Sequence, residues 1–166
     1  MLNKGDYPYM NEMAWRDALA FKPDIVVIKL GTNDSKPENW QHGDEFRQDL
    51  VQMITSLRPD LAQLSQKSKK SKKAKKAQQP QSPQIFLCTP IPAFKSTWNI
   101  RDSVIVNNII PIQEDVARQY GLQVIDLHTL YANDGDKMLV DGIHPDGKGA
   151  QRLADIIAEE LTKQKQ

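Results

Sequence analysis

The sequence predicts an α/β fold in which a parallel sheet carries helices on both faces. Three short, continuous apolar segments rich in β-branched residues have the composition of buried strands. Segments whose apolar residues follow helical spacing lie before, between and after them. Strands that alternate with crossover helices of this length form parallel sheets, and 166 residues are enough for one domain with a substantial core.

The outer elements of this pattern are two helices that enclose the three strands in the sequence. The predicted strands cover residues 25–30, 84–88 and 122–127. A first helix is predicted at residues 12–21, where Trp15 and Leu19 lie one turn apart. A last helix is predicted at residues 147–163, with an apolar stripe made of Leu153, Ile156, Ile157 and Leu161.

Two further helices connect the strands. Asp44 is expected to cap the first, which loosens near Pro59 and whose apolar residues are Phe46, Leu50, Met53, Ile54 and Leu57. The second is predicted at residues 100–120, with a kink or restart at Pro111 and a C-cap at Gly121. Its inward residues are expected to be Val104, Ile105, Ile109, Ile112 and Val116.

A lysine-rich segment separates the second helix from the second strand. Residues 65–84 consist mainly of Lys, Ser, Gln, Ala and Pro, so we expect a flexible surface insertion. The interpretation as a solvated loop is preferred, and the alternative is a patch that contacts anionic polymers, nucleic acid or lipid. The seven lysines at residues 67–76 leave 15 basic against 21 acidic residues elsewhere. The globular part is therefore mildly acidic, and we expect no nucleic-acid binding by it.

Composition also limits the chemistry and the location of the chain. The lone cysteine, Cys88, excludes an internal disulfide and a multi-cysteine zinc site, and its apolar neighbours predict a buried thiol. No apolar run approaches the roughly 20 residues that span a bilayer. The residues after Met1 do not resemble a signal peptide, which predicts a cytoplasmic protein, or a secreted one if a signal peptide lies upstream.

The first candidate for chemistry is Gly31-Thr32-Asn33-Asp34, directly after the first predicted strand. Ligands bind beyond the carboxyl ends of the strands in open parallel sheets, so a functional side chain is expected at Asn33. The Asn33 amide could donate a hydrogen bond to a developing oxyanion. The alternative is a turn in which Gly31 and Asn33 only supply backbone freedom.

The second candidate is Asp141-Gly142-Ile143-His144-Pro145, directly before the last predicted helix. A carboxylate three residues from a histidine, across a turn with glycine, can bind one imidazole nitrogen and leave the other free as a base. Alternatively, Asp141 and Asp146 are turn or capping residues and His144 is an exposed loop residue. A metal site is a third alternative, although it lacks a second histidine cluster.

Several other residues receive plainer interpretations. His42 is expected to be a loop residue, and His128 could border a cleft but has no obvious partner. Three aromatic residues in predicted loops, for which a role as pocket walls is an alternative, are Trp40, Trp98 and Tyr131.

Together, the two motifs resemble the Asn and Asp-x-x-His blocks of the SGNH hydrolases, also called GDSL esterases. The resemblance implies a flavodoxin-like, three-layer α/β/α sandwich and hydrolysis of carboxylic esters, acetylated carbohydrates among them, through an acyl-enzyme. It implies that His144 is the general base, Asp141 its orienting carboxylate and Asn33 an oxyanion-hole donor. No cofactor is implied.

The departure from the family is the nucleophile. The family's Gly-Asp-Ser block and the glycine of its second block are not in the sequence, so the first two strands of the fold are expected to be absent. Residues 1–166 are therefore predicted to be one SGNH-type domain that is incomplete at its N-terminus, from a mis-started gene or a remnant. The first predicted strand should then have an unpaired edge and a half-covered apolar face.

We expect the isolated chain to have little or no esterase activity, because Ser35, Ser96 and Ser103 do not follow a first strand as a nucleophile would. Two alternatives stay open. One is a module that binds a carbohydrate or acyl ligand without turnover. The other is a metal-assisted hydrolase that uses Asp34, Asp141 and His144.

Overall fold

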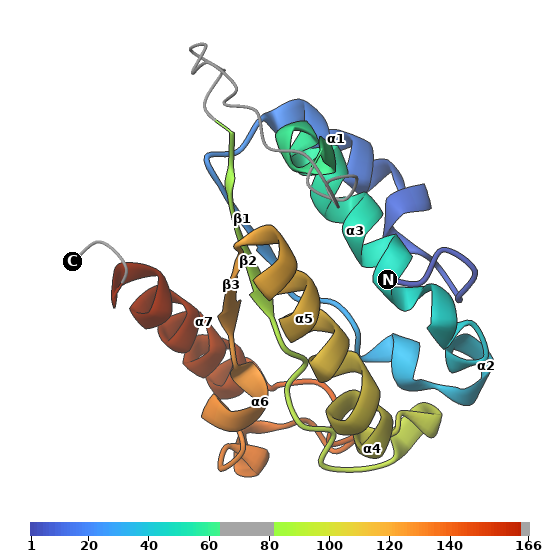
Figure 1. The fold of residues 1–166 in the computed structure, drawn as a ribbon. Coiled ribbons are helices and arrows are strands. Elements are labelled where there is room, and N and C mark those ends of the chain that lie inside the picture. Colours follow the sequence, from blue (N-terminus) through green and yellow to red (C-terminus); the bar gives the residue numbers. More distant parts are fainter. Residues whose placement is uncertain (64–81, 164–166) are drawn as a thin grey trace.

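The sheet has three parallel strands in the order β1-β2-β3 (Figure 1). The computed structural model describes residues 1–63 and 82–163, so the predicted insertion at 65–84 lies almost entirely outside the described residues. The strands are β1 (Ile25–Ile28), β2 (Gln84–Cys88) and β3 (Gln123–Ile125). The second strand has its predicted bounds, and the first and third end earlier than predicted.

Local hydrogen bonds explain both early ends. The carbonyl of Leu30 accepts a hydrogen bond from the Gln113 side chain at 3.1 Å instead of from a neighbouring strand. After β3, the Asp126 side chain accepts a hydrogen bond from the backbone nitrogen of Thr129 at 3.2 Å and thereby caps a short helix. Leu127, predicted as the end of the strand, is the first residue of that helix.

Helices cover both faces of the sheet, which confirms the predicted three-layer α/β/α sandwich (Figure 1). They are α1 (Met13–Phe21), α2 (Pro37–Trp40), α3 (Phe46–Leu57), α4 (Asp102–Val104), α5 (Ile110–Tyr120), α6 (Leu127–Leu130) and α7 (Gly147–Thr162). Leu87 of β2 packs in the core beneath α1, α3 and α5, whereas Phe86 and Cys88 pack against α6 and α7. None of the described helices is long and apolar enough to cross a membrane.

The helices differ from the predictions at two places. Asp44 does not cap α3, because it lies in a 3-10 turn, Gly43–Glu45, that runs directly into the helix. At Pro111 the predicted restart is confirmed, because a π-helical turn, Ile105–Ile109, ends before α5 and the proline lies in the first turn of α5, which tolerates its missing N–H. Leu19 is exposed, whereas Trp15 one turn before it is buried as expected.

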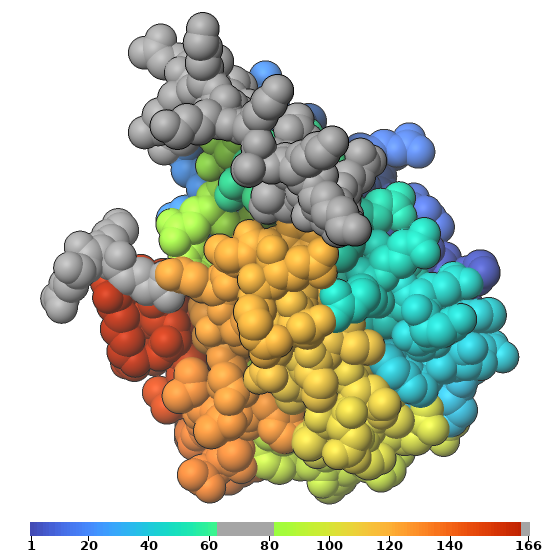
Figure 2. Space-filling view, viewed as in Figure 1, coloured from blue at the N-terminus to red at the C-terminus, as the bar shows by residue number. Residues whose placement is uncertain are grey.

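Other predicted features are confirmed. Gly121 ends α5 in the left-handed conformation, with φ of 62°. On the outer surface shown in Figure 2, α3 and α5 lie side by side, and Arg47 of α3 binds Asp115 and Gln119 of α5. Of the four predicted inward residues of α7, Leu153 and Ile156 are buried, and Ile157 and Leu161 are partly buried and pack against the same cluster.

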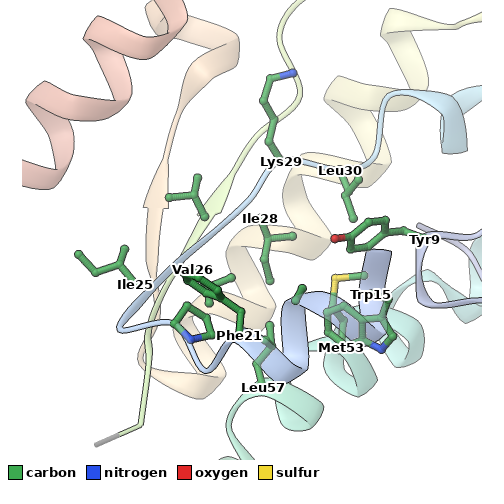
Figure 3. A pocket seen from close by; sticks show the side chains of 13 residues that line it. Tyr9, Trp15, Phe21, Ile25, Val26, Ile28, Lys29, Leu30, Met53 and Leu57 are labelled. Atoms are coloured by element: carbon green, nitrogen blue, oxygen red, sulfur yellow. The ribbon is translucent and has the colours of Figure 1, made fainter. Parts of the chain in front are cut away.

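The edge of β1 is open among the described residues, as predicted. β1 pairs with β2 alone in this part of the chain, and Ile25 and Val27 are 47% and 36% exposed. Along this edge runs an apolar cavity of about 510 Å³, lined by residues of α1, β1 and α3, among them Trp15 and Met53 (Figure 3). At the edge of β1, apolar side chains and unpaired backbone N–H and C=O groups are therefore both exposed to water.

The N-terminal segment is bound to the core by two buried aspartates. The N-terminal ammonium of Met1 and the backbone nitrogen of Leu2 donate to the Asp34 carboxylate at 3.0 Å and 2.6 Å. The backbone nitrogen and side-chain amide of Asn3 donate to Asp49 at 2.8 Å and 2.7 Å. Both carboxylates are buried, so these donors replace the water that the charges lose.

A third buried residue, Asn39, links the same segment to the turn that carries Asn33. Its side-chain nitrogen donates to the carbonyl of Asn33 at 2.8 Å and to the Asp6 carboxylate. Its side-chain oxygen accepts from the backbone nitrogen of Asp6 at 2.9 Å. The N-terminal segment and Asn39 thus hold the carbonyl of Asn33 and the side chain of the next residue, Asp34.

We predict that Asp34→Ala lowers the free energy of unfolding by about 3 kcal/mol, because the buried ammonium of Met1 and the buried N–H group of Leu2 lose their acceptor. Urea denaturation followed by circular dichroism measures the change. Glu38→Ala, at an exposed position of α2, is the matched control and should change stability by less than about 0.5 kcal/mol. Equal stabilities of the two variants would contradict the role given to Asp34.

Candidate functional site

Asp141 and His144 form the predicted pair in the loop before α7. The Nδ1 atom of His144 lies 3.2 Å from Oδ2 of Asp141, and Oδ1 of Asp141 accepts from the backbone nitrogens of Ile143 and His144 at 2.7 Å and 2.8 Å. One carboxylate therefore both orients the imidazole and closes the turn. The His144 side chain is 60% exposed, and its Nε2 atom forms no hydrogen bond with the described residues, as a free base would require.

The electrostatics of this pair favour an ionised Asp141. The backbone N–H groups of His144 and Ile143 hold the pKa of the Asp141 carboxyl below its usual range, and the His144 imidazole contributes less. Gly142 has a φ of 68° between the two residues, which favours glycine at that position. An ionised acceptor at Nδ1 leaves Nε2 as the unprotonated nitrogen of a neutral imidazole.

The ends of this loop are fixed independently. The backbone nitrogen of Leu139 donates to the carbonyl of His144 at 2.8 Å, and Met138 pairs with Pro145 in an antiparallel bridge. Asp146 caps α7 by accepting from the backbone nitrogen of Gly149 at 2.8 Å. The capping interpretation is thus confirmed for Asp146, whereas Asp141 binds the histidine.

Asn33 lies beyond the carboxyl end of β1, at the start of a 3-10 turn, Asn33–Ser35. The residue is exposed, and none of the described residues forms a hydrogen bond with its side-chain amide. It lines a small hollow of about 170 Å³ together with Tyr7, Lys29 and Thr32. The amide is therefore available to donate to a ligand, as an oxyanion-hole residue must be.

The segment 93–101, which follows β2, connects the two halves of the site. Thr97 donates through Oγ1 to the carbonyl of Asp141 at 2.7 Å. Arg101 donates through Nε to the carbonyl of Ser35 at 2.8 Å, and its backbone nitrogen donates to Ser35 Oγ at 3.1 Å. Asn33 and His144 form no hydrogen bond with each other among the described residues, so this segment is the physical link between them.

The same segment brings an aromatic ring to His144. The rings of Trp98 and His144 meet edge to face, with their centroids 5.3 Å apart. Of the other two aromatic residues considered as pocket walls, Tyr131 is fully buried and Trp40 packs against Phe46. Sequence spacing could not assign the contact of Trp98, because it arises from loops that are far apart in the chain.

His128 has a partner that the sequence did not reveal. Its Nε2 atom lies 3.3 Å from Oδ1 of Asp102, the first residue of α4. The same Asp102 oxygen accepts from the backbone nitrogen of Ala93 at 2.8 Å, so this pair holds the start of the connecting segment. His42 lies in a loop before a 3-10 turn, as expected.

The alternative nucleophile and metal ligands do not fit the structure. Ser35 is fully buried, and its Oγ donates to the carbonyl of Thr32 at 2.8 Å. Asp34 is engaged by Met1 and Leu2, so it does not join Asp141 and His144. Within residues 1–63 and 82–163, no three His, Cys, Asp or Glu side chains are grouped as metal ligands.

Cys88 is the buried core thiol that the sequence predicted. Burial raises its pKa to about 11, which keeps it in the protonated form at neutral pH. A thiolate nucleophile at this position is thereby disfavoured. The apolar cavity beside β1 is likewise no catalytic site, because neither Asn33, Asp141 nor His144 lines it.

Solved structures with the same fold carry related names. A lipase/acylhydrolase from Enterococcus faecalis has a TM-score of 0.66 at 23% identity, and the match covers 90% of this chain and 66% of that one. An acetyl xylan esterase, AlAXEase, has a TM-score of 0.57 at 17% identity, with 92% of this chain and 74% of that one covered. At these identities the likeness shows the fold alone.

A sequence relative is much closer in identity. The chain is 73% identical over 158 residues to an acetylxylan esterase from Xylanibacter ruminicola, a match that covers 95% of this chain and 32% of that protein. This chain therefore spans about a third of the length of its relative. A model of the GDSL-like Lipase/Acylhydrolase family matches residues 5–152, across both the Asn33 turn and the His144 loop. The chain belongs to the GDSL-like lipase/acylhydrolase family.

Proposed function

We propose that this chain supplies the general base, its orienting carboxylate and an oxyanion donor of a carboxylic ester hydrolase. The observation that carries the proposal is the Asp141–His144 pair, in which one imidazole nitrogen is held by a carboxylate and the other forms no hydrogen bond with the described residues. The amide of Asn33, which lies beyond the end of β1 and is likewise without a hydrogen bond among these residues, supports it.

In the proposed reaction, a serine hydroxyl attacks the ester carbonyl while His144 Nε2 takes its proton. Asp141 stabilises the imidazolium through Nδ1–H, and the Asn33 amide donates to the oxyanion, an interaction worth about 3 kcal/mol in comparable sites. His144 then returns the proton to the leaving alcohol, and water repeats the sequence to release the acid. The sequence contains no Gly-Asp-Ser block, and the proposal is that a serine outside this chain acts as the nucleophile.

The proposed substrate class is an acetylated carbohydrate. The relative that shares 73% identity is named acetylxylan esterase, and the matched region includes the Asn33 and His144 motifs. The exposure of His144 agrees with a substrate that is part of a larger polymer, because a deeply enclosed base would not reach an ester on a chain of sugars.

A second function, binding of an acetylated carbohydrate without turnover, is favoured by one observation. Ser35, the serine nearest in sequence to Asn33, is buried and hydrogen-bonded within its own turn. A fluorophosphonate that labels activated serines separates the two functions. Sugar binding without labelling would support the binding module, whereas labelling would support the hydrolase.

The hydrolase proposal is tested by expressing the chain alone and together with the in-frame DNA upstream of Met1. Acetate release from acetylated xylan is measured for both. We expect activity only when a Gly-Asp-Ser segment is included. A closed or unrelated upstream frame, with no activity in either form, would exclude serine catalysis.

In the active form, we predict that His144→Asn lowers kcat by at least about a thousandfold, because the serine then lacks a base. His42→Asn is the matched control, since His42 lies in a different loop, and its kcat should stay within about twofold. The rate of acetate release at saturating substrate measures both. A similar kcat for the two variants would remove His144 from the mechanism.

We predict that Asp141 titrates at lower pH in the folded chain than in a short Asp-Gly-Ile-His peptide, because two backbone N–H groups bind its charged form. Because folding lowers the pKa of Asp141, its contribution to the free energy of unfolding is present above the pKa of the peptide, about 3.9. This contribution is lost as the pH falls through the pKa of Asp141 in the folded chain. The side-chain carboxyl ¹³C shift followed by NMR gives both midpoints, and equal midpoints would refute the assignment.

A further inference from the structure

Trp98 has a backbone conformation that its own burial does not explain. Trp98 and Asn99 have φ values of 52° and 58°, in the left-handed region that non-glycine residues rarely adopt. Such a conformation is strained and persists only where the surroundings hold it. The Trp98 side chain stays 55% exposed, so little apolar area is buried in return.

Contacts on both sides hold the segment in this conformation. Before Trp98, Thr97 Oγ1 binds the carbonyl of Asp141, and after it Ile100 is buried in the core. Arg101 then binds Ser35 in the turn that begins at Asn33. The indole is thereby placed beside His144 by a segment anchored to both catalytic motifs.

We infer that Trp98 is a carbohydrate-binding platform that positions a sugar ring beside His144, an inference that rests on the proposed function. An indole presents a wide, flat apolar face that complements the C–H face of a pyranose, while the sugar hydroxyls stay in water. Because the ring touches His144, a sugar stacked on the rest of its surface holds its acetyl ester next to the base. Trp98 is thus a specificity-determining residue, distinct from the residues that transfer protons.

The test measures binding without turnover, so it does not depend on a nucleophile. The ¹⁵N-labelled chain is titrated with xylotetraose, and the indole Nε1–H signals of its three tryptophans are followed by NMR, with Trp98→Phe used for assignment. We expect the signal of Trp98 to move and those of Trp15 and Trp40 to stay. An immobile Trp98 signal at millimolar xylotetraose would overturn the inference.

Variants then separate stacking from a structural role. Calorimetric titration of Trp98→Ala should give a Kd for xylotetraose raised at least about tenfold, and Trp98→Tyr, which keeps a flat ring, should stay within about threefold. Trp40→Phe is the matched control, since Trp40 packs on Phe46, and its Kd should not change. Circular dichroism confirms that each variant is folded.

Two results would contradict the platform. If Trp98→Ala binds xylotetraose as tightly as the unaltered chain, Trp98 is not the sugar contact. If Trp98→Ala changes only the titration of His144, the ring shields the base and does not hold a substrate. The proposed hydrolase fails separately, through the His144→Asn measurement, because sugar binding does not require the base.

Discussion

The burial of the Asp34 carboxylate is the constraint on which the Asn33 half of the site depends. A buried charge must regain through hydrogen bonds what it loses in hydration, and here Met1 and Leu2 supply the donors. Since Asp34 directly follows Asn33, those bonds also fix where the exposed amide lies. Asn39 completes the arrangement by binding the carbonyl of Asn33 itself. A rigid backbone under an unbonded side chain is what an oxyanion donor requires.

Asp34, in the motif after β1, and Asp141, in the motif before α7, therefore have different roles. Asp34 is buried, and its charge is engaged in hydrogen bonds that stabilise the fold. Asp141 also binds backbone nitrogens, but its second oxygen reaches His144 and its charge acts on the site. The difference lies in which neighbouring groups bind the two oxygens of each carboxylate. Because Asp34 is bound by Met1 and Leu2, it is not available as a ligand in a metal-assisted mechanism.

The sequence predicted the layers and the local pairs because both rest on spacing along the chain. Continuous apolar strands and periodic helices gave the three-layer sandwich, and a three-residue separation gave the contact of Asp141 with His144. Contacts between distant loops were not predictable in this way. Trp98 meets His144, and His128 meets Asp102, through turns whose geometry depends on tertiary packing. Asp44 was predicted to cap α3, but it lies in the 3-10 turn Gly43–Glu45, which runs directly into the helix.

Asn33 and the His144 loop adjoin different parts of the sheet. A change at the open edge of β1 should therefore affect them differently. Asn33 follows β1, whose outer side carries exposed apolar residues, whereas the His144 loop lies between β3 and α7, where α7 covers the sheet. A disturbance at the β1 edge should therefore reach Asn33 first. The hydrogen bonds of the 93–101 segment to Ser35 and to Asp141 oppose that loss of alignment. We therefore expect the relative placement of Asn33 and His144 to depend on this segment, because it is bonded both to the turn that begins at Asn33 and to the His144 loop.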